Sequence, residues 1–249
     1  MIVQYIGQYI MNDSVLIIFR GGCSRVNDPT LVCKNIELQV LNPLRSRVNV
    51  DIIFSTSSKG DPKVDTFRTH LQPKQIIYTA SGQIVNFQET LLNLQNIYSR
   101  YTHIIFLRFE LLYKVSFDSL SILDTNGLRL PYKEDSQELF DSHKYYGDCI
   151  IMISTDHFAN VSKALLDADF DTISTGKGHD ILHRIVTVVL AAFPETPVTC
   201  ILDGFFQSNT HYCGNSIKLN PLYIMTHYPY CGDKQYFLDS NYYTVSAIN

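Results

Sequence analysis

Residues 103–114 read HIIFLRFELLYK, and this stretch decides the fold that we predict. It opens as an unbroken apolar run, which is typical of a strand buried on both faces of a mostly parallel sheet. Arg108 and Glu110 follow that run two positions apart, so along a strand both side chains should point to the same face. Ligands of open α/β sheets bind beyond the carboxyl ends of the strands. The charged pair therefore marks a candidate site, although a salt bridge at a strand end would explain it as well.

Length and composition limit the class of protein. The chain has 249 residues, 45% of them hydrophobic, with a formal net charge of −4 and no stripe of lysine and arginine that could neutralise nucleic acid. Its six cysteines form no CxxC pair, which favours a reducing compartment. We find neither a signal peptide nor an apolar run of about 18 residues that could span a membrane. We therefore expect a soluble, cytoplasmic protein without a transmembrane segment, and its oligomeric state stays open.

The remaining apolar runs alternate with helical patterns. Strands are predicted at 14–19, 48–58, 74–79, 149–154 and 198–202, and helices at 28–41, 86–101, 159–166 and 181–193. Pro43 should end the first of these helices. Such alternation is typical of a parallel sheet with right-handed crossovers. Because no linker or repeat interrupts it, we predict one α/β domain with a mostly parallel central sheet flanked by helices.

Two loops after predicted strands carry groups that suit a nucleotide. In the first, Gly21 and Gly22 allow a sharp turn and a close approach of the backbone to a ligand, and Arg20 and Arg25 could hold phosphate as forks. A glycine turn with solvated arginines is the alternative, since the loop is neither GxGxxG nor a Walker A sequence. In the second loop, residues 55–58 are all hydroxyl-bearing and could bind a base or a ribose, or only turn.

A parallel sheet would bring both loops and the Arg108–Glu110 pair to one edge. Arginines, hydroxyls and one carboxylate suit a nucleotide diphosphate bound with a divalent cation, because hard cations prefer oxygen ligands. Metal and arginine charge would then stabilise a diphosphate leaving group.

The order of these pieces resembles that of small nucleotide-sugar glycosyltransferases of the GT-A type, particularly the compact ones encoded by large DNA viruses of algae and amoebae. The resemblance is carried by residues 17–20, 50–56, 103–112, 147–148 and 203–210, and it covers most of residues 15–225. It implies a single GT-A-like, Rossmann-like domain over residues 1–249, with donor binding in the N-terminal half and acceptor binding in the C-terminal half. A viral protein of this kind would act in the host cytoplasm.

The resemblance also implies roles for individual residues. The donor, with a UDP-sugar favoured, would be held by Arg20, Gly21, Gly22, Arg25, Ser55, Thr56 and Arg108. Where the family has a DxD motif this chain has Arg108-Phe109-Glu110, so Glu110 alone would hold Mn²⁺ or Mg²⁺ and metal dependence is in doubt. Asp180 would be the catalytic base, with Asp148 as its competitor, and Asp180 could equally be a helix cap. Asp156, Ser208, Asn209 and Thr210 would bind the acceptor, although a turn would explain the last three.

The expected activity is transfer of a sugar from a nucleotide sugar to a hydroxyl of a glycan or glycoprotein, for example a viral capsid glycan. Two alternatives stay open. One is a non-catalytic nucleotide- or glycan-binding module on the same fold. The other is a nucleotide-binding hydrolase, which the absence of Walker and GxSxG sequences disfavours. The DxD at residues 167–169 is interpreted as a solvated helix end.

Overall fold

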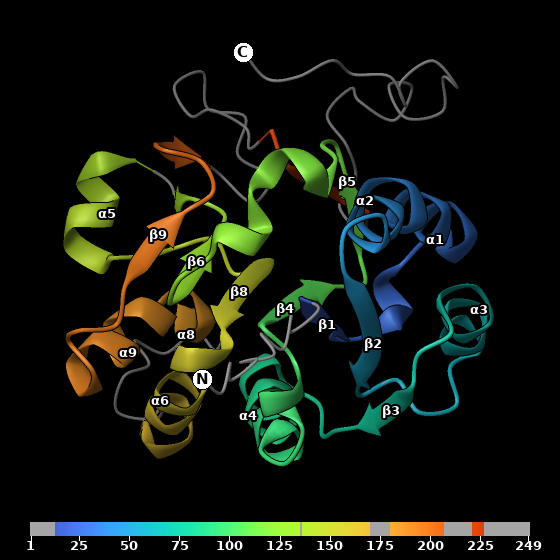
Figure 1. Cartoon of the computed structure of the whole chain (residues 1–249), viewed down its shortest axis with the longest axis horizontal. Helices are drawn as coiled ribbons and strands as arrows, with labels where there is room; N and C mark the ends of the chain where they lie inside the picture. Colours follow the sequence, from blue (N-terminus) through green and yellow to red (C-terminus); the bar gives the residue numbers. More distant parts are fainter. Residues whose placement is uncertain (1–12, 135, 170–179, 207–220, 227–249) are drawn as a thin grey trace, which may run out of the picture.

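A computed structural model gives the structure of residues 13–134, 136–169, 180–206 and 221–226 (Figure 1). Its strands are β1 (Ser14–Arg20), β2 (Asn49–Thr56), β3 (Gln75–Tyr78), β4 (His103–Arg108), β5 (Leu111–Tyr113), β6 (Leu128–Leu130), β7 (Lys133–Glu134), β8 (Ile150–Ser154), β9 (Val198–Cys200), β10 (Phe205–Phe206) and β11 (Tyr223–Met225). Its α-helices are α1 (Pro29–Ile36), α2 (Asn42–Arg45), α3 (Pro62–Leu71), α4 (Gln83–Leu94), α5 (Gln137–His143), α6 (Thr155–Asp167), α8 (Asp180–His183) and α9 (Ile185–Ala192). The short helices are 3₁₀ turns at Cys23–Arg25, Tyr98–Arg100, Phe117–Leu120 and Ile122–Asp124 and a π-helix at Glu37–Leu41.

Within these described residues, the central sheet has seven strands in the order β3-β2-β1-β4-β8-β6-β9. β1 pairs in parallel with both β2 and β4, and β8 runs antiparallel to both of its neighbours, β4 and β6. The predicted mostly parallel sheet is therefore confirmed, with β8 as its exception. This reversal matters for the site, because the start of β8, rather than its end, lies beside the carboxyl ends of β1 and β4.

Helices cover both faces of the sheet, and the alternation of side chains along β1 shows how. Val15, Ile17 and Phe19 belong to one buried cluster, with residues of α1, α2 and α3. Leu16 and Ile18 belong to the other, with residues of α4, α6 and α9. In Figure 1, α4, α6, α8 and α9 lie together below the sheet, and α1 and α2 lie above it. Strands buried on both faces read as unbroken apolar runs, which is why the sequence predicted β1 and β4 so directly.

Helix boundaries follow local signals in some places and depart from them in others. Asp28 caps α1 as predicted, its carboxylate accepting from the backbone N–H of Leu31 at 3.0 Å. The prediction that Pro43 ends this helical region is wrong. The chain stays helical through the π-helix, and Pro43 lies in the first turn of α2, where its missing N–H leaves no helical bond unmade. The predicted helix at 181–193 is interrupted at Arg184 between α8 and α9.

The central strand is shorter than its apolar run. β4 ends at Arg108, and β5 leaves the main sheet to pair antiparallel with β11, placing Leu112 opposite Ile224. A pairing across more than one hundred residues cannot be inferred from a local pattern, so the run was predicted as one strand. Among the residues that the structure describes, no helix combines the length and apolarity needed to cross a membrane.

Candidate functional site

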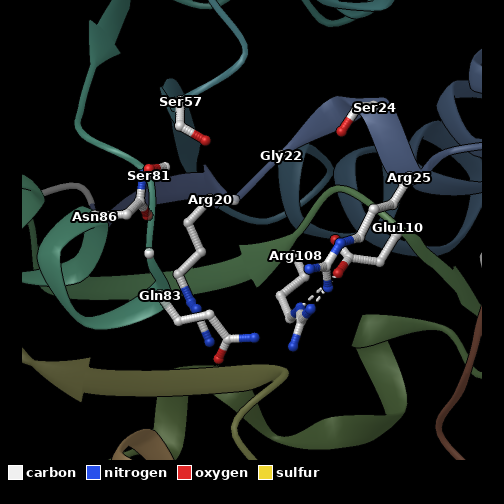
Figure 2. Close-up of a pocket in the computed structure, with 12 residues that line it drawn as sticks. Arg20, Gly22, Ser24, Arg25, Ser57, Ser81, Gln83, Asn86, Arg108 and Glu110 are labelled. Carbon is white, nitrogen blue, oxygen red and sulfur yellow. Dashed lines mark hydrogen bonds and ion pairs between the residues drawn. The ribbon is translucent and has the colours of Figure 1, made fainter. Parts of the chain in front are cut away.

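A pocket of about 420 Å³ lies at the carboxyl ends of β1, β2 and β4 (Figure 2). The loop after β1, the loop between β3 and α4, and the end of β4 surround it. Its lining residues are Arg20, Gly21, Gly22, Ser24, Arg25, Ser57, Ser81, Gly82, Gln83, Asn86, Arg108 and Glu110. The volume falls in the range of small-molecule sites.

Two buried arginines form one wall of this pocket. Arg20 ends β1 and Arg108 ends β4, and the parallel register places them directly opposite each other. They are only 2% and 8% exposed. Like charges facing each other across paired strands are unfavourable, and a buried charge needs a counter-charge. The arrangement therefore requires nearby carboxylates.

Asp148 supplies the first counter-charge. Its Oδ2 lies 3.3 Å from Arg20 Nη2 and 3.7 Å from Arg108 Nη1, and its backbone carbonyl accepts from Arg20 Nη2 at 2.5 Å. Asp148 precedes β8, and the reversed direction of β8 brings it to this edge of the sheet. The preceding Gly147 permits the approach, since a Cβ there would lie 2.8 Å from Pro131 Cγ.

The charges of this cluster shift one another's ionisation. Burial alone would raise the pKa of Asp148, but His183, Arg108 and Arg20 together lower it well below its usual range. Burial lowers the pKa of Arg20. Burial would also lower the pKa of Arg108, but the nearby carboxylate of Glu110 raises the pKa of Arg108 above its usual value. Arginine stays protonated in either case. Asp148 is thus a fixed anion that neutralises two guanidinium groups.

Glu110 supplies the second counter-charge. Its Oε1 accepts from Arg108 Nε at 2.8 Å and also contacts Nη2 of the same guanidinium, as the dashed lines in Figure 2 show. The prediction that Arg108 and Glu110 lie on the same side is confirmed. Glu110 is only 2% exposed, and its Oε2 is buried without a hydrogen-bond partner. That oxygen can accept a hydrogen bond but has no donor among the described residues.

The loop after β1 lies at the pocket, at the carboxyl end of the strand, as the sequence predicts. Gly21 has φ of +100°, a left-handed conformation that favours glycine, and its N–H donates to the carbonyl of Ser55 at 3.0 Å. Gly22 and Arg25 also line the pocket. The Arg25 side chain is exposed and makes no hydrogen bond or ion pair with a described residue. It is the cation at this pocket most available to a ligand.

The hydroxyl-rich loop needs a correction. Ser55 and Thr56 were predicted to contact the nucleotide, but both are fully buried and neither lines the pocket. The Ser55 hydroxyl lies 2.5 Å from Thr90 Oγ1, and Thr56 Oγ1 accepts from the backbone N–H of Ser58 at 3.1 Å. Within β2, successive side chains pack against the two opposite faces of the sheet. A hydroxyl can therefore reach the pocket only after the strand has ended. Ser57, one residue later, does line the pocket.

A second wall was missed by the sequence. Ser81, Gly82, Gln83 and Asn86 come from the loop after β3 and the first turn of α4. A helix was predicted to open at Asn86, and it opens three residues earlier. The signal that could have revealed this wall is the end of the strand predicted at 74–79, because the loops that follow parallel strands gather at the same edge of the sheet.

Several predicted residues do not meet at this pocket. Asp156, predicted for the acceptor, does not line this pocket, and its role stays a prediction. It lies in the first turn of α6 beyond the carboxyl end of β8, and Ser154 of that strand pairs with His103, at the opposite edge of the sheet from Arg108. Asp180 begins α8, but its side chain lies outside the described part of the chain, as do Ser208, Asn209 and Thr210 entirely. The DxD at 167–169 begins at the last residue of α6, and the Asp167 side chain is 63% exposed, as predicted for a solvated helix end.

The described residues do not fit a divalent cation held by the protein. Glu110 Oε2 is one unpartnered oxygen, whereas the other oxygen of Glu110 and the carboxylate of Asp148 are engaged by arginines. No group of three His, Cys, Asp or Glu side chains that could hold a metal exists among the described residues. Mg²⁺ and Mn²⁺ sites need several oxygens. The metal role of Glu110 stays a prediction.

Comparisons with known proteins show the fold. No protein-family model and no curated protein matches the chain. Among solved structures, 4-diphosphocytidyl-2C-methyl-D-erythritol synthase from Anaerococcus prevotii DSM 20548 is similar with a TM-score of 0.51 at 10% identity, covering 78% of this chain and 90% of that chain. A protein assigned as a nucleotide-diphospho-sugar transferase from Desulfovibrio desulfuricans G20 gives 0.47 at 11%, covering 78% and 81%. The apo form of mouse xyloside xylosyltransferase 1 gives 0.41 at 10%, covering 77% and 85%. The predicted α/β, GT-A-like fold class is confirmed. The viral type stays a prediction.

The buried ion pairs predict a pH-dependent effect of Asp148→Asn. Removing one partner of a buried pair costs about 3–5 kcal/mol, so the variant should be destabilised by about that amount at pH 7. The pKa of Asp148 is lowered in the folded protein relative to about 3.9 in the unfolded chain, so its contribution is complete above about pH 4 and decreases as acid protonates it. Urea unfolding at pH 7 and pH 3 should show the difference between wild type and variant narrowing in acid.

Asp167→Asn is the matched control, because this carboxylate pairs with Lys163 on the exposed surface of α6. Its effect should stay below about 0.5 kcal/mol at both pH values. An Asp148 variant as stable as the wild type at pH 7 would show that the cluster does not depend on this charge.

Proposed function

We propose that the protein transfers a sugar from a nucleoside-diphosphate sugar to a hydroxyl of a glycan or glycoprotein. The observation that carries this proposal is the pocket at the strand ends, whose wall contains the guanidinium groups of Arg20, Arg25 and Arg108. Two carboxylates, Glu110 and Asp148, offset two of these three positive charges. The excess positive charge suits an anionic ligand, and arginine forks match phosphate oxygens in pairs.

The polar groups left without partners support a diphosphate at this wall. Arg20 Nε is buried and has no acceptor, and the Arg25 guanidinium pairs with no described residue. The flexible glycines of the loop after β1 leave open space for a ligand, since nothing lies within 4 Å of a Cβ built at Gly21. The solved structure whose fold this chain shares is named for a diphosphocytidyl compound, which is consistent with a nucleoside diphosphate here.

The free oxygen of Glu110 suits the sugar part of such a donor. A carboxylate accepts hydrogen bonds from hydroxyls, and Oε2 lies beside the guanidinium group that would hold the diphosphate. A nucleoside diphosphate sugar carries hydroxyls next to its diphosphate, so one ligand would satisfy the anion-binding arginines and this acceptor together. A nucleotide without the sugar would leave Oε2 unpaired.

Transfer requires a leaving group and a base. The bond between the anomeric carbon and the diphosphate oxygen breaks as the acceptor oxygen attacks, and the charge that develops on the leaving diphosphate falls toward Arg20 and Arg108, which are already in place. Asp148 is a poor base because its pKa is lowered and its carboxylate is engaged by two arginines. Asp180 therefore remains the proposed acceptor of the hydroxyl proton. UDP-sugar, the donor favoured by the resemblance, is also kept as part of the proposal.

A non-catalytic nucleotide- or glycan-binding module is the second candidate. It is favoured by one observation, namely that both described carboxylates at the arginine wall are paired with arginines. Such a module would bind the donor without cleaving it.

Removal of Arg25 should weaken donor binding without unfolding the protein. The side chain is exposed and has no described partner, so Arg25→Gln should leave the unfolding midpoint unchanged. Loss of one charge-assisted contact should raise the Kd for UDP-glucose about tenfold, measured by isothermal titration. Arg68→Gln, which removes another exposed arginine, on α3 and outside the pocket, should leave the Kd unchanged. Equal affinities for all three proteins would place the donor elsewhere.

Donor breakdown distinguishes the enzyme from the binding module. Incubated with a UDP-sugar and no acceptor, the enzyme should release free sugar slowly, because water replaces the acceptor hydroxyl. Arg108→Lys keeps the charge but loses the fork, so the rate at saturating donor should fall roughly tenfold or more. Chromatography of the products measures both. Tight donor binding with no release of sugar, and no transfer to any glycan tried, would favour the module.

The metal predicted at Glu110 is tested by the Kd for the donor with EDTA and with Mn²⁺. Since the described residues offer one free carboxylate oxygen, we expect the two values to agree within about threefold. A tightening of tenfold or more with Mn²⁺ that is lost in Glu110→Gln would contradict this expectation. It would also establish the metal role that the sequence predicted.

A further inference from the structure

The two ends of the pocket differ in charge. In Figure 2, Arg25, Arg108 and Glu110 lie at one end, and Ser57, Ser81 and Asn86 lie at the other. Arg20 lies between the two ends, with its Cζ 5.5 Å from the ring centroid of Phe87 in α4, and Ser57, Ser81 and Asn86 carry neutral hydroxyl and amide groups. A ligand with a diphosphate at the arginines would place its uncharged nucleoside among these groups. This step rests on the proposed function.

Asn86 has a fixed orientation at that neutral end. Its Nδ2 donates to the backbone carbonyl of Ser55 at 3.3 Å and to Thr79 Oγ1 at 2.5 Å. A backbone carbonyl can only accept, so the amide nitrogen must face it and Oδ1 must face away. The hydroxyl of Thr90 donates to the backbone carbonyl of Asn86 at 2.5 Å and also contacts Ser55 Oγ, which holds the first turn of α4 against β2.

The oxygen of this amide has no partner. Asn86 lines the pocket and is 3% exposed, and its Oδ1 is buried without a hydrogen-bond partner among the described residues. Buried polar groups in native proteins are nearly always hydrogen-bonded, so an orphan acceptor in a residue that lines a pocket is a candidate contact for a donor on a ligand. Ser57 and Ser81 lie at the same end of the pocket and carry hydroxyls that can donate to carbonyl oxygens.

We propose that Asn86 Oδ1 accepts a hydrogen bond from the ring N–H of the donor's nucleobase and so favours uracil over cytosine. Uracil presents its N3–H between two carbonyl oxygens, which matches a fixed acceptor at an end of the pocket that also carries hydroxyl donors. Cytosine presents an unprotonated nitrogen at the same place, and two acceptors would then face each other. A site built to accept from one N–H rejects the analogue that lacks it.

The test changes the ligand before it changes the protein. Isothermal titration of the wild type with UDP, N3-methyl-UDP, CDP and 2′-deoxy-UDP should give at least tenfold weaker binding for N3-methyl-UDP and CDP than for UDP. Binding of 2′-deoxy-UDP should match that of UDP within about threefold. Asn86→Ala should lower the affinity for UDP about tenfold and bring UDP, CDP and N3-methyl-UDP within threefold of one another.

Inorganic pyrophosphate, which reaches only the arginine end, is the control for the fold of the variant. Its affinity should be the same in the wild type and in Asn86→Ala. If pyrophosphate and UDP bind but the wild type does not distinguish UDP from N3-methyl-UDP, this inference is overturned and the proposed function stands. A loss of affinity for 2′-deoxy-UDP that disappears in Asn86→Ala would also overturn it, since Asn86 would then contact the ribose. If neither pyrophosphate nor UDP binds, the proposed function falls as well.

Discussion

Two guanidinium groups fixed side by side at the ends of β1 and β4 are the constraint on which the rest of this structure depends. The parallel register leaves Arg20 and Arg108 no freedom to separate, and burial removes the water that would otherwise screen them. Two carboxylates neutralise these charges. Asp148 comes just before β8, which runs antiparallel to its neighbours, and Glu110 comes from the turn after β4. Replacing such a cluster by apolar residues would often be neutral for stability, so its presence suggests a use other than holding the fold.

That use follows from where the counter-charges lie. Asp148 is not among the lining residues and contacts the arginines from outside the pocket, whereas Glu110 lines the pocket and holds Arg108 through only one of its two oxygens. The two carboxylates thereby fix the orientation of the guanidinium groups, which still line the pocket. An anion entering the pocket meets charges that need no rearrangement, which is the condition under which electrostatic stabilisation is most effective. Arg25, which is exposed and unpaired among the described residues, adds the charge that makes the pocket net positive.

The sequence revealed one wall of this pocket and not the other, for physical reasons. Arg20, Gly21, Gly22, Arg25, Arg108 and Glu110 follow strands buried on both faces, and such strands produce long apolar runs whose ends are visible. The sequence predicts Ser55 and Thr56, and not Ser57, as nucleotide contacts, because an apolar run does not show at which residue a strand leaves the sheet. The position of Asp156, away from this pocket, could not be predicted, because the direction of β8 is set by its neighbours and no local pattern records it. Asn86 looked like an ordinary opening of a helix, and only its hydrogen bonds show that its oxygen is left over.

The leftover atoms constrain the ligand more tightly than the charges do. Arginines alone would accept phosphate, sulfate or any nucleotide. The pocket also has two buried acceptors without donors, Glu110 Oε2 beside the arginines and Asn86 Oδ1 at the neutral end. A fitting ligand must therefore be anionic in its middle and carry hydrogen-bond donors on both sides of that charge. Inorganic phosphate fails this requirement, and a nucleoside triphosphate fails it at the arginine end. A nucleoside diphosphate joined to a sugar meets it, with a base N–H on one side and sugar hydroxyls on the other.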